Sequence, residues 1–392
     1  MSQLPDAEPS PGNGDEAGAQ ADPGALQARS AVQSAVQSAV QSTVHSAAQS
    51  ATEVKVRAKH FAARVEDEIQ SARQGWRRRR GHVPTVIPYA GYGARGWIRV
   101  LCRVVYAKPE TDATTQFEGM RGWRSFFSVP VAEQRVRVTA DGVSADLPID
   151  RGGVVDARLE VDLAPGWHTI ELRAGQGDAV TAEVFVVDQA ERFGVVSDVD
   201  DTIMVTALPR PFLAFWNTFV LDEHARRGVA GMAVLYDRIR RRHTGAPIVY
   251  LSTGAWNVAP TLRRFLARNL YPVGPLLLTD WGPTVDRFFR SGREHKRAEL
   301  RRLAEEFPDV RWLLFGDDGQ HDEEIYGEFA REHPRSVAAV AIRQLSVGEA
   351  VLAGGRSKAA ERESESPVRW FFGPDGAALW EQLTAAGIIQ AH

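Results

Sequence analysis

Three aspartates, Asp198, Asp200 and Asp201, fall within four consecutive positions of the segment VVSDVDDTIMVT, directly after a run of β-branched residues. Like charges at this spacing repel and raise one another's pKa, so the fold needs something that compensates them. A bound cation or a reaction that uses the charge would do so. The segment therefore predicts a site of chemistry where a buried strand ends.

Phosphoryl transfer is a reaction that this arrangement could perform. One aspartate can attack phosphorus and form an aspartyl phosphate, which water then hydrolyses. A second aspartate, two residues further on and on the same side of the chain, can protonate the leaving oxygen. Carboxylate oxygens are also the ligands that Mg²⁺ prefers, with water completing its octahedron. The sequence therefore predicts Mg²⁺ as the cofactor.

Further polar residues follow other apolar runs of the chain. Ser252 comes after PIVYL, Asp317 and Asp318 come after RWLLFG, and Asp322 lies a few residues beyond them. Lys296 stands at the start of a predicted helix, HKRAELRRLAEEF. An ammonium group and a metal ion can together neutralise the charge on the phosphoryl oxygens. Asp201 is expected to be a loop acid, and Asp318 to be solvated or to act through another residue.

A fold that brings strand ends together is needed to assemble these residues. Between residues 191 and 350, apolar strands without alternation are separated by helical segments, which is typical of a parallel sheet covered on both faces. Ligands bind at the carboxyl ends of the strands in such a sheet. The predicted fold class is therefore α/β, a doubly wound, Rossmann-like parallel sheet whose rim collects the polar residues.

A second region, residues 83–190, alternates apolar and polar residues with period two. Asp141-Gly142 is a strong signal for a tight hairpin turn, and Pro165-Gly166 marks a second turn. Short strands with turns about every ten residues predict a small all-β sandwich domain before the α/β domain. The region contains no set of residues that suggests catalysis.

The ends of the chain have a different composition. Residues 1–50 contain the repeat SAVQSAVQSAVQS and are expected to form a disordered, low-complexity tail. Residues 51–82 form a predicted amphipathic helix with nine Lys or Arg against four acids. This helix either packs on the next domain or a partner helix, or makes peripheral membrane contact through residues 52–80. Residues 351–392 are expected to be a linker and a segment that docks on the catalytic domain.

Composition excludes several classes of protein. The net charge is only −3, which does not favour nucleic acid as a partner. The single cysteine, Cys102, excludes an internal disulfide framework and a Cys-based zinc site, and fits a cytoplasmic protein. No apolar run approaches the roughly 18 residues of a membrane-spanning helix. Nothing in the sequence indicates an oligomeric state.

The polar residues resemble the four motifs of the haloacid dehalogenase (HAD) superfamily of aspartate-nucleophile phosphatases. The stretch DVDDT resembles the first motif, Asp-x-Asp-x-Thr. This resemblance implies that Asp198 is the nucleophile, that Asp200 is the general acid and base, and that Thr202 supports the loop. Asp198 and Asp200 are also implied as metal ligands, Asp200 through its backbone carbonyl.

The other three motifs follow in order. Ser252 resembles the second motif and is implied to bind the phosphoryl oxygens, and Lys296 resembles the third. GDDGQHD resembles the fourth, which implies Asp317 as a metal ligand and Asp322 as a support through water. The implied fold is therefore HAD-like.

Longer stretches are similar to one branch of the superfamily, the phosphatidate phosphatase catalytic-domain family of the actin-patch-protein type. They are DVDDTIMVT, YLSTGAWN, SGREHK and FPDVRWLLFGDDGQHDEEIY. Bacterial members of that family also carry a β-rich domain first, and the resemblance covers about residues 83–350. Two departures lie beside the predicted site: Asp318 replaces a serine, and Gly254-Ala255 replaces Ser-Pro.

The resulting prediction is a Mg²⁺-dependent phosphatase that converts phosphatidate to diacylglycerol, located in the cytoplasm or peripherally at a membrane. The apolar segment PRPFLAFWNTF, residues 209–219, is either core, a small cap or a seat for an acyl chain. Two alternatives stay open. One is a phosphatase for a soluble phosphomonoester, and the other is a non-catalytic, membrane-associated scaffold.

Overall fold

In the computed structural model of the protein, residues 72–392 form one compact unit. The residues that the structure describes are 79–107, 130–131, 134–205, 227–279, 285–319, 321–353 and 366–390. In the helix that begins at residue 285, side chains are described only from residue 292 onward. The predicted tail, nearly all of the predicted basic helix and the apolar segment 209–219 lie outside these residues. No helix among the described residues is both long enough and apolar enough to span a membrane.

Six parallel strands form the central sheet, in the order β13–β12–β9–β14–β15–β16. They are β9 (Phe193–Asp198), β12 (Ile248–Ala255), β13 (Leu276–Thr279), β14 (Arg311–Asp317), β15 (Val337–Arg343) and β16 (Trp370–Gly373). Most of their residues are buried because helices cover the sheet, which explains the apolar runs without alternation. The predicted parallel sheet of an α/β fold is confirmed.

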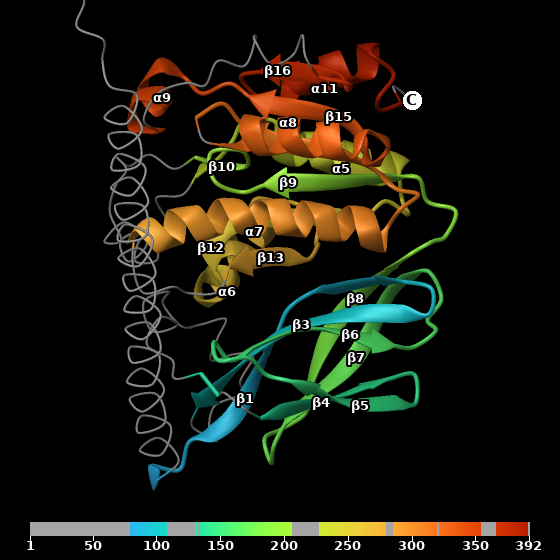
Figure 1. Ribbon diagram of the computed structural model, residues 1–392, viewed down its shortest axis with the longest axis vertical. Coiled ribbons are helices and arrows are strands. Elements are labelled where there is room, and N and C mark those ends of the chain that lie inside the picture. Colours follow the sequence, from blue (N-terminus) through green and yellow to red (C-terminus); the bar gives the residue numbers. More distant parts are fainter. Residues whose placement is uncertain are drawn as a thin grey trace, which may run out of the picture. The chain divides into compact units, whose positions relative to one another are not determined.

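The strand order reverses beside β9. The chain first builds β12 and β13 on one side of β9 and then returns to build β14, β15 and β16 on the other. The strands are connected by α5 (Met232–Arg242), α6 (Ala259–Arg268), α7 (Val285–Glu306), α8 (Asp322–Glu332) and α9 (Val347–Ala353), and α11 (Gly376–Ala385) follows β16. Figure 1 shows α7 and α8 on the nearer face of the sheet and α5 behind it.

Two short elements flank the α/β connections near β9. β10 (Met204–Val205) pairs antiparallel with β11 (Arg227–Gly228), and the 3₁₀ helix η1 (Trp256–Val258) leads from β12 into α6. A second 3₁₀ helix, η2 (Pro334–Ser336), leads into β15.

The helix that carries Lys296 is longer than expected. The sequence predicts that it begins at about His295, whereas α7 begins at Val285, so Lys296 lies in the middle of the helix. The Ser291-Gly292 pair suggests a loop, but here the glycine allows a close approach. A Cβ atom at Gly292 would lie 3.0 Å from the side chain of Thr253 in β12. Packing of α7 against the sheet therefore overrides the local signal.

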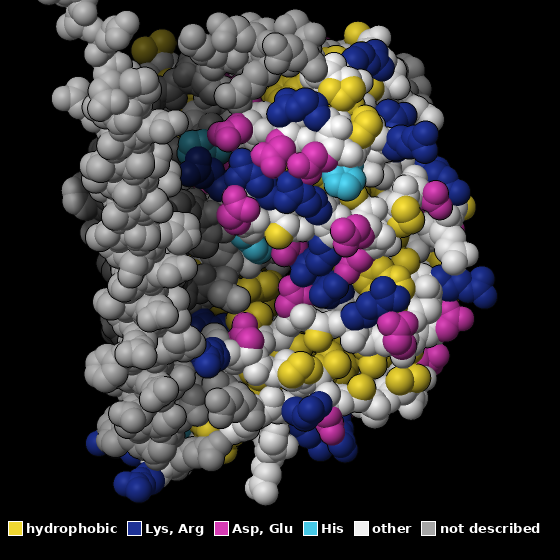
Figure 2. All heavy atoms as spheres, viewed as in Figure 1, with side chains coloured by type: hydrophobic (Ala, Val, Ile, Leu, Met, Phe, Trp, Pro, Cys, Tyr) yellow, Lys and Arg dark blue, Asp and Glu magenta, His cyan; other side chains and the backbone are white. Residues whose placement is uncertain are grey.

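Surface ion pairs join α7 to α8. Arg297 Nε lies 2.7 Å from Glu328 Oε2, and Arg301 Nε lies 2.9 Å from Glu332 Oε2. In Figure 2, seen from the same side as Figure 1, acidic and basic side chains intermingle over this face. Exposed pairs of this kind contribute little stability, so the position of α7 depends mainly on its buried side.

Eight strands form a second sheet before the parallel one. They are β1 (Val83–Pro88), β2 (Gly91–Ala94), β3 (Trp97–Ala107), β4 (Arg135–Ala140), β5 (Val143–Pro148), β6 (Val154–Glu160), β7 (Gly166–Ala174) and β8 (Val180–Val187). The long β3 pairs with β1 and β2 along one edge and with β6 along the other. Hydrogen bonds therefore join all eight strands into one sheet, and the predicted small sandwich stays a prediction.

The hairpin predicted at Asp141-Gly142 is confirmed. β4 and β5 pair antiparallel on either side of these two residues. Their φ angles are 44° and 76°, and a two-residue turn of this type needs positive φ at both positions.

The two sheets share buried contacts. Tyr89, which follows β1, stacks on Trp256 with ring centroids 5.2 Å apart. Tyr92 and Trp97 both pack against Phe307, at the end of α7. The eight-stranded sheet therefore supports η1 and α7, the segments next to the residues predicted to react. The predicted domain boundaries stay predictions.

Candidate active site

The nucleophile position lies at the carboxyl end of the central strand. Asp198 is the last residue of β9 and is buried. The chain then turns tightly, because the N–H groups of Ile203 and Met204 both donate to the carbonyl of Val199, at 3.2 Å. Thr202 Oγ1 donates to Asp198 Oδ2 at 3.2 Å. The turn thus leaves the carboxylate fixed at the rim of the sheet.

Lysine 296 reaches this carboxylate from α7. Its Nζ donates to Asp198 Oδ1 at 2.6 Å and to Asp322 Oδ1 at 2.5 Å. Asp322 is the first residue of α8, and all three side chains are buried. Lys296 thus links the end of β9 to the start of α8, the helix that follows β14.

A fourth charged group, Asp317, completes what we call the acidic cluster: Asp198, Lys296, Asp317 and Asp322. Asp317 ends β14, and its Oδ1 accepts a hydrogen bond from the N–H of Gly319 at 2.8 Å. Its buried Oδ2 meets no hydrogen-bond donor among the described residues. One oxygen from each of the three aspartates lies within 4.8 Å of the others. Three carboxylates that gather this closely, together with a buried Asp317 oxygen that has no donor among the described residues, fit Mg²⁺.

Burial makes the acidic cluster electrostatically unstable by itself. Burial, together with the charge of Asp322, raises the pKa of Asp198 well above its usual range, although Lys296 opposes the shift. Burial and the neighbouring carboxylates also raise the pKa of Asp317. Burial alone would lower the pKa of Lys296, but Asp198 and Asp322 raise it, so the lysine stays charged. A divalent cation would restore both carboxylates to their ionised form.

The predicted acid and phosphate-binding residues form an adjacent pair. Ser252 lies in β12, where Leu251 is in register with Asp198. Its Oγ donates to Asp200 Oδ2 at 3.2 Å and accepts from the N–H of Gly254 at 3.0 Å. Asp200 is only partly buried, unlike Asp198. The side chain of Asp200 thus points to Ser252 and does not belong to the group of three oxygens.

All of the predicted site residues therefore lie at one rim. The aspartates whose carboxylate oxygens gather are Asp198, Asp317 and Asp322, and the side chain of Asp200 is not among them. The roles that the resemblance implies, with Asp322 as a support through water and Asp200 as a ligand through its backbone carbonyl, stay predictions.

Two acids that were expected to be solvated or in a loop are buried. Asp201 and Asp318 are each 4% exposed. Asp318 Oδ1 accepts the N–H of Leu345 at 2.8 Å and so ties the end of β14 to the segment after β15. Asp201 and Asp318 follow the ends of β9 and β14, and a polar residue at the end of an apolar strand is the pattern that predicted Asp198 and Asp317.

Three tyrosines that the sequence did not single out hold the backbone around the site. Tyr236 bonds the hydroxyl of Ser197 at 2.7 Å, directly before the nucleophile position. Tyr271 donates to the carbonyl of Ile203 at 2.9 Å, and Tyr326 donates to the carbonyl of Phe315 at 2.9 Å. Tyr236 and Tyr326 lie in helices and Tyr271 follows one, where apolar or aromatic residues are typical of the core, so no local pattern reveals these contacts.

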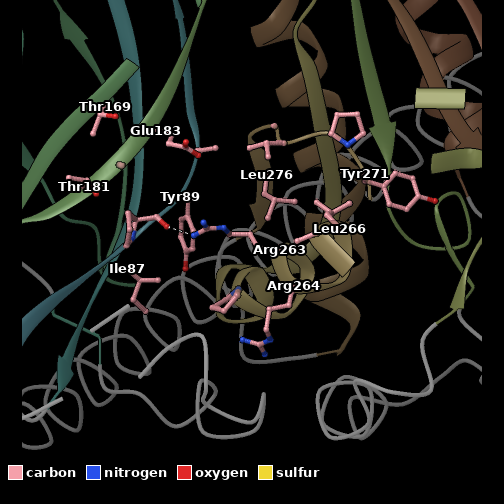
Figure 3. Close-up of a pocket in the computed structure, with 18 of the residues that line it drawn as sticks. Ile87, Tyr89, Thr169, Thr181, Glu183, Arg263, Arg264, Leu266, Tyr271 and Leu276 are labelled. Atoms are coloured by element: carbon pink, nitrogen blue, oxygen red, sulfur yellow. Dashed lines mark hydrogen bonds between the residues drawn. The ribbon is translucent and has the colours of Figure 1, made fainter. Parts of the chain in front are cut away.

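A cavity of about 620 Å³ lies elsewhere, between the eight-stranded sheet and α6 (Figure 3). Ile87, Thr181 and Glu183 line one side, and Arg263 and Leu266 line the other. None of the four acidic-cluster residues lines it. The acidic cluster, and not this cavity, brings together the residues that the sequence predicts to react, so we take the cluster as the candidate active site.

Comparisons with known proteins support this choice. Residues 193–344 match the family model described as phosphatidate phosphatase APP1, catalytic domain. The phosphatidate phosphatase APP1 of Saccharomyces cerevisiae is 24% identical over 205 residues, which is 50% of this chain and 34% of that protein. An uncharacterized protein of Schizosaccharomyces pombe is 24% identical over 168 residues, 43% of this chain and 27% of that protein.

The chain thus spans about a third of the length of the curated relatives that it matches. Among solved structures, a carbohydrate acetylesterase from Xanthomonas citri is 11% identical with a TM-score of 0.26, covering 69% of this chain and 73% of its own. A TM-score this low carries no argument about fold or function. Over residues 193–344 the chain is similar to the phosphatidate phosphatase APP1 catalytic domain, and this match spans β9 to β15 and the whole acidic cluster.

Proposed function

We propose that the protein is a Mg²⁺-dependent phosphatase of the HAD type, and that it hydrolyses phosphatidate to diacylglycerol through an aspartyl phosphate. The observation that carries the proposal is the buried Asp198 at the end of β9, bonded to Lys296 and next to the unpartnered oxygen of Asp317. The strand order reverses beside β9, as in doubly wound sheets that bind ligands at the point of reversal.

The first half of the reaction uses Asp198 and Asp200. A carboxylate oxygen of Asp198 attacks phosphorus, and the bond between phosphorus and the ester oxygen breaks. Asp200 donates its proton to that leaving oxygen, which departs as an alcohol. Lys296, held at 2.6 Å from Asp198, balances the charge on the phosphoryl oxygens.

The second half releases phosphate. Asp200 now accepts a proton from water, whose oxygen attacks phosphorus and displaces the carboxylate of Asp198. Ser252 bonds Asp200 in this structure and is close enough to the nucleophile strand to donate to a phosphoryl oxygen instead. Mg²⁺, held by Asp198, Asp317 and the backbone carbonyl of Asp200 with support from Asp322, would neutralise charge that develops on the phosphoryl group.

The choice of a lipid substrate is supported by two features. The yeast relative is named a phosphatidate phosphatase, and it matches half of this chain. The segment that follows the nucleophile turn in sequence, residues 209–219, contains three Phe and one Trp and suits an acyl chain. We also propose peripheral membrane contact through residues 52–80, in a cytoplasmic protein. Sedimentation with anionic liposomes, with and without residues 1–82, tests that contact.

Phosphate release from phosphatidate in mixed micelles tests the function. We expect release that requires Mg²⁺ and is lost in Asp198→Asn, with Asp309→Asn, an exposed acid before β14, as the matched control. A soluble phosphomonoester hydrolysed equally well with and without micelles would move the substrate to the soluble class. No release from either substrate class would overturn the proposal.

A further inference from the structure

A buried arginine holds the nucleophile turn from two strands away. Arg343 is the last residue of β15 and is 6% exposed. Its Nη1 donates to the backbone carbonyl of Asp201 at 2.7 Å. Asp201 has a φ of 57°, in the left-handed region that few residues besides glycine, asparagine and aspartate adopt. A charged donor therefore fixes the peptide between Asp201 and Thr202, at this turn of unusual backbone conformation.

The arginine is itself held in place. Its Nη2 donates to Glu349 Oε1 in α9 at 2.7 Å, and Glu349 Oε2 accepts the N–H of Ser346 at 2.8 Å. Partial burial would raise the pKa of Glu349, but the hydrogen bonds from Arg343 and Ser346 together with the charge of Arg343 lower that pKa. The backbone carbonyl of Arg343 accepts the N–H of Asp318 at 3.1 Å. Arg343 thus has little freedom to follow the turn if the turn moves.

The contact lies where it can control the geometry of proton transfer. The peptide that Arg343 holds joins Asp201 to Thr202. It therefore lies one residue after Asp200, the proposed acid, and leads into Thr202, whose hydroxyl bonds Asp198. Rotation of this peptide would move the Asp200 carboxyl relative to the nucleophile. The N–H of Asp201 also donates to the carbonyl of Met204 at 2.8 Å, so both sides of the residue are fixed.

We propose that Arg343 is a positioning residue that keeps Asp200 in line with the leaving oxygen by holding the carbonyl of Asp201. This inference rests on the proposed phosphatase function. It assigns no bond-making step to Arg343, because the guanidinium acts through the turn. Loss of Arg343 should impair the protonation of a leaving group more than the attack by Asp198.

The leaving group separates these two effects. An alkyl phosphate such as phosphatidate needs a proton on its leaving oxygen, whereas p-nitrophenolate leaves without one. For Arg343→Met we expect kcat/KM on the alkyl phosphate, which reports only the steps up to departure of the leaving group, to fall about 10- to 100-fold, since general acid catalysis contributes at least that much. On p-nitrophenyl phosphate we expect a fall of about threefold or less. Arg343→Lys, which keeps one charged donor, should recover part of the loss.

A matched control is Arg311→Met. Arg311 also donates from its guanidinium to a backbone carbonyl, that of Val337 at 3.2 Å. It is the first residue of β14, at the end of the strand that lies away from Asp317 and the rim. We expect this variant to keep the wild-type ratio of the two rates. Equal losses on both substrates for Arg343→Met, or no loss on either, would overturn the proposal.

Hydrogen–deuterium exchange tests the inference without any activity. The amides of Ile203 and Met204 are bonded within the turn, so Arg343→Met should speed their exchange several-fold and leave β14 unchanged. Where Arg343→Met does not fold, Arg343→Lys serves for the same measurement. Unchanged exchange in residues 195–206 would sink the proposal even if the enzyme is active. A wild-type protein without phosphatase activity would instead count against the proposed function, and exchange would still decide whether Arg343 holds the turn.

Discussion

Helix α7 carries buried charges on two sides, and the two groups are built differently. One is the acidic cluster, in which Lys296 is the sole cation for Asp198, Asp317 and Asp322 among the described residues. The other, which we call the interface cluster, joins α7 to the eight-stranded sheet and consists of Arg99, Asp156, Glu299, Arg302 and Glu306. The acidic cluster is buried, whereas the interface cluster is partly buried and its Asp156 is exposed. The balance of charge then decides what each cluster can do.

The carboxylates of the interface cluster each have a cationic partner within the chain. Arg99 donates to Glu306 through Nε at 3.1 Å and to Asp156 through Nη1 at 2.8 Å. Arg302 Nη1 donates to the second oxygen of Asp156 at 2.8 Å and also pairs with Glu299. Tyr92 adds a hydroxyl to Glu306 at 2.9 Å. Such a cluster fixes the position of α7 and leaves no charge for a ligand.

The acidic cluster lacks this balance. Asp317 Oδ2 is buried without a donor among the described residues, and Asp198 shares its only ammonium with Asp322. The comparison teaches that burial of charge is not the mark of a reactive site. The mark is a buried charge that the chain leaves uncompensated.

The largest expected effect comes from removing that uncompensated charge. Asp317→Asn keeps an acceptor for the N–H of Gly319 but loses the negative charge. We expect phosphatase activity to fall at least about 100-fold, because charge stabilisation at the phosphoryl group is lost. We also expect the melting temperature without added metal to stay equal or rise, because an unpaired buried charge has been removed.

Magnesium titration of the melting temperature checks the same variant without an activity assay. Mg²⁺ should stabilise the wild-type protein, since a ligand that binds only the folded state raises its stability, and should stabilise Asp317→Asn much less. If the variant melts several degrees lower than wild type in metal-free buffer, the charge of Asp317 stabilises the fold. The acidic cluster would then be compensated within the chain, like the interface cluster.

A middle-sized effect is expected from the interface cluster. Arg99→Met removes a cationic partner from both Glu306 and Asp156. We therefore expect a loss of about 3 kcal/mol in the free energy of unfolding. The kcat of the folded variant should stay within about threefold of wild type, because the chemistry is on the other side of α7. Urea unfolding and steady-state rates measure the two quantities.

The control for this variant is Arg137→Met, which breaks an exposed Arg–Asp pair in the same eight-stranded sheet. We expect no measurable change in stability there. If Arg99→Met lowers kcat as strongly as it lowers stability, the interface cluster contributes to the geometry around Lys296, and the two clusters are not separable.

Much of the parallel sheet could be read from the sequence because buried parallel strands are apolar on both faces. VVSD, PIVYLS and RWLLFGD each combine such a run with a polar residue at its end, and all three lie in the sheet with those polar residues at one rim. Local sequence carries this information because strand burial and strand end are both local properties.

Contacts between distant segments could not be read in this way. VAAVAIR ends in Arg343, which looks like a solvated residue at a strand end, and only the packed structure shows its bond to Asp201. The pairing of Arg99 with Glu306 joins residues far apart in sequence and has no local signal. The joining of eight strands into one sheet likewise depends on the pairing of β3 along both edges, which alternation alone does not specify.

The smallest expected effect is a pH dependence that arises in the interface cluster. Burial raises the pKa of Glu299 to about 7 from 4.5, although Arg302 opposes the shift. His295 lies 3.8 Å away, but burial lowers its pKa to about 4, so it stays neutral above that pH and cannot compensate. Across the interface, Asp156 raises the pKa of Glu299 and Arg99 lowers it.

A raised folded-state pKa means that the native protein binds the proton of Glu299 more tightly than the unfolded chain does. Stability from this group is therefore full below pH 4.5 and is lost as the pH rises to about 7. We expect the free energy of unfolding of the wild-type protein to fall over this range by on the order of 1 to 2 kcal/mol more than that of Glu299→Gln. Parallel pH profiles for the two proteins would contradict the assignment, because Glu299 would then be ionised and fully paired with Arg302, like the other carboxylates of its cluster.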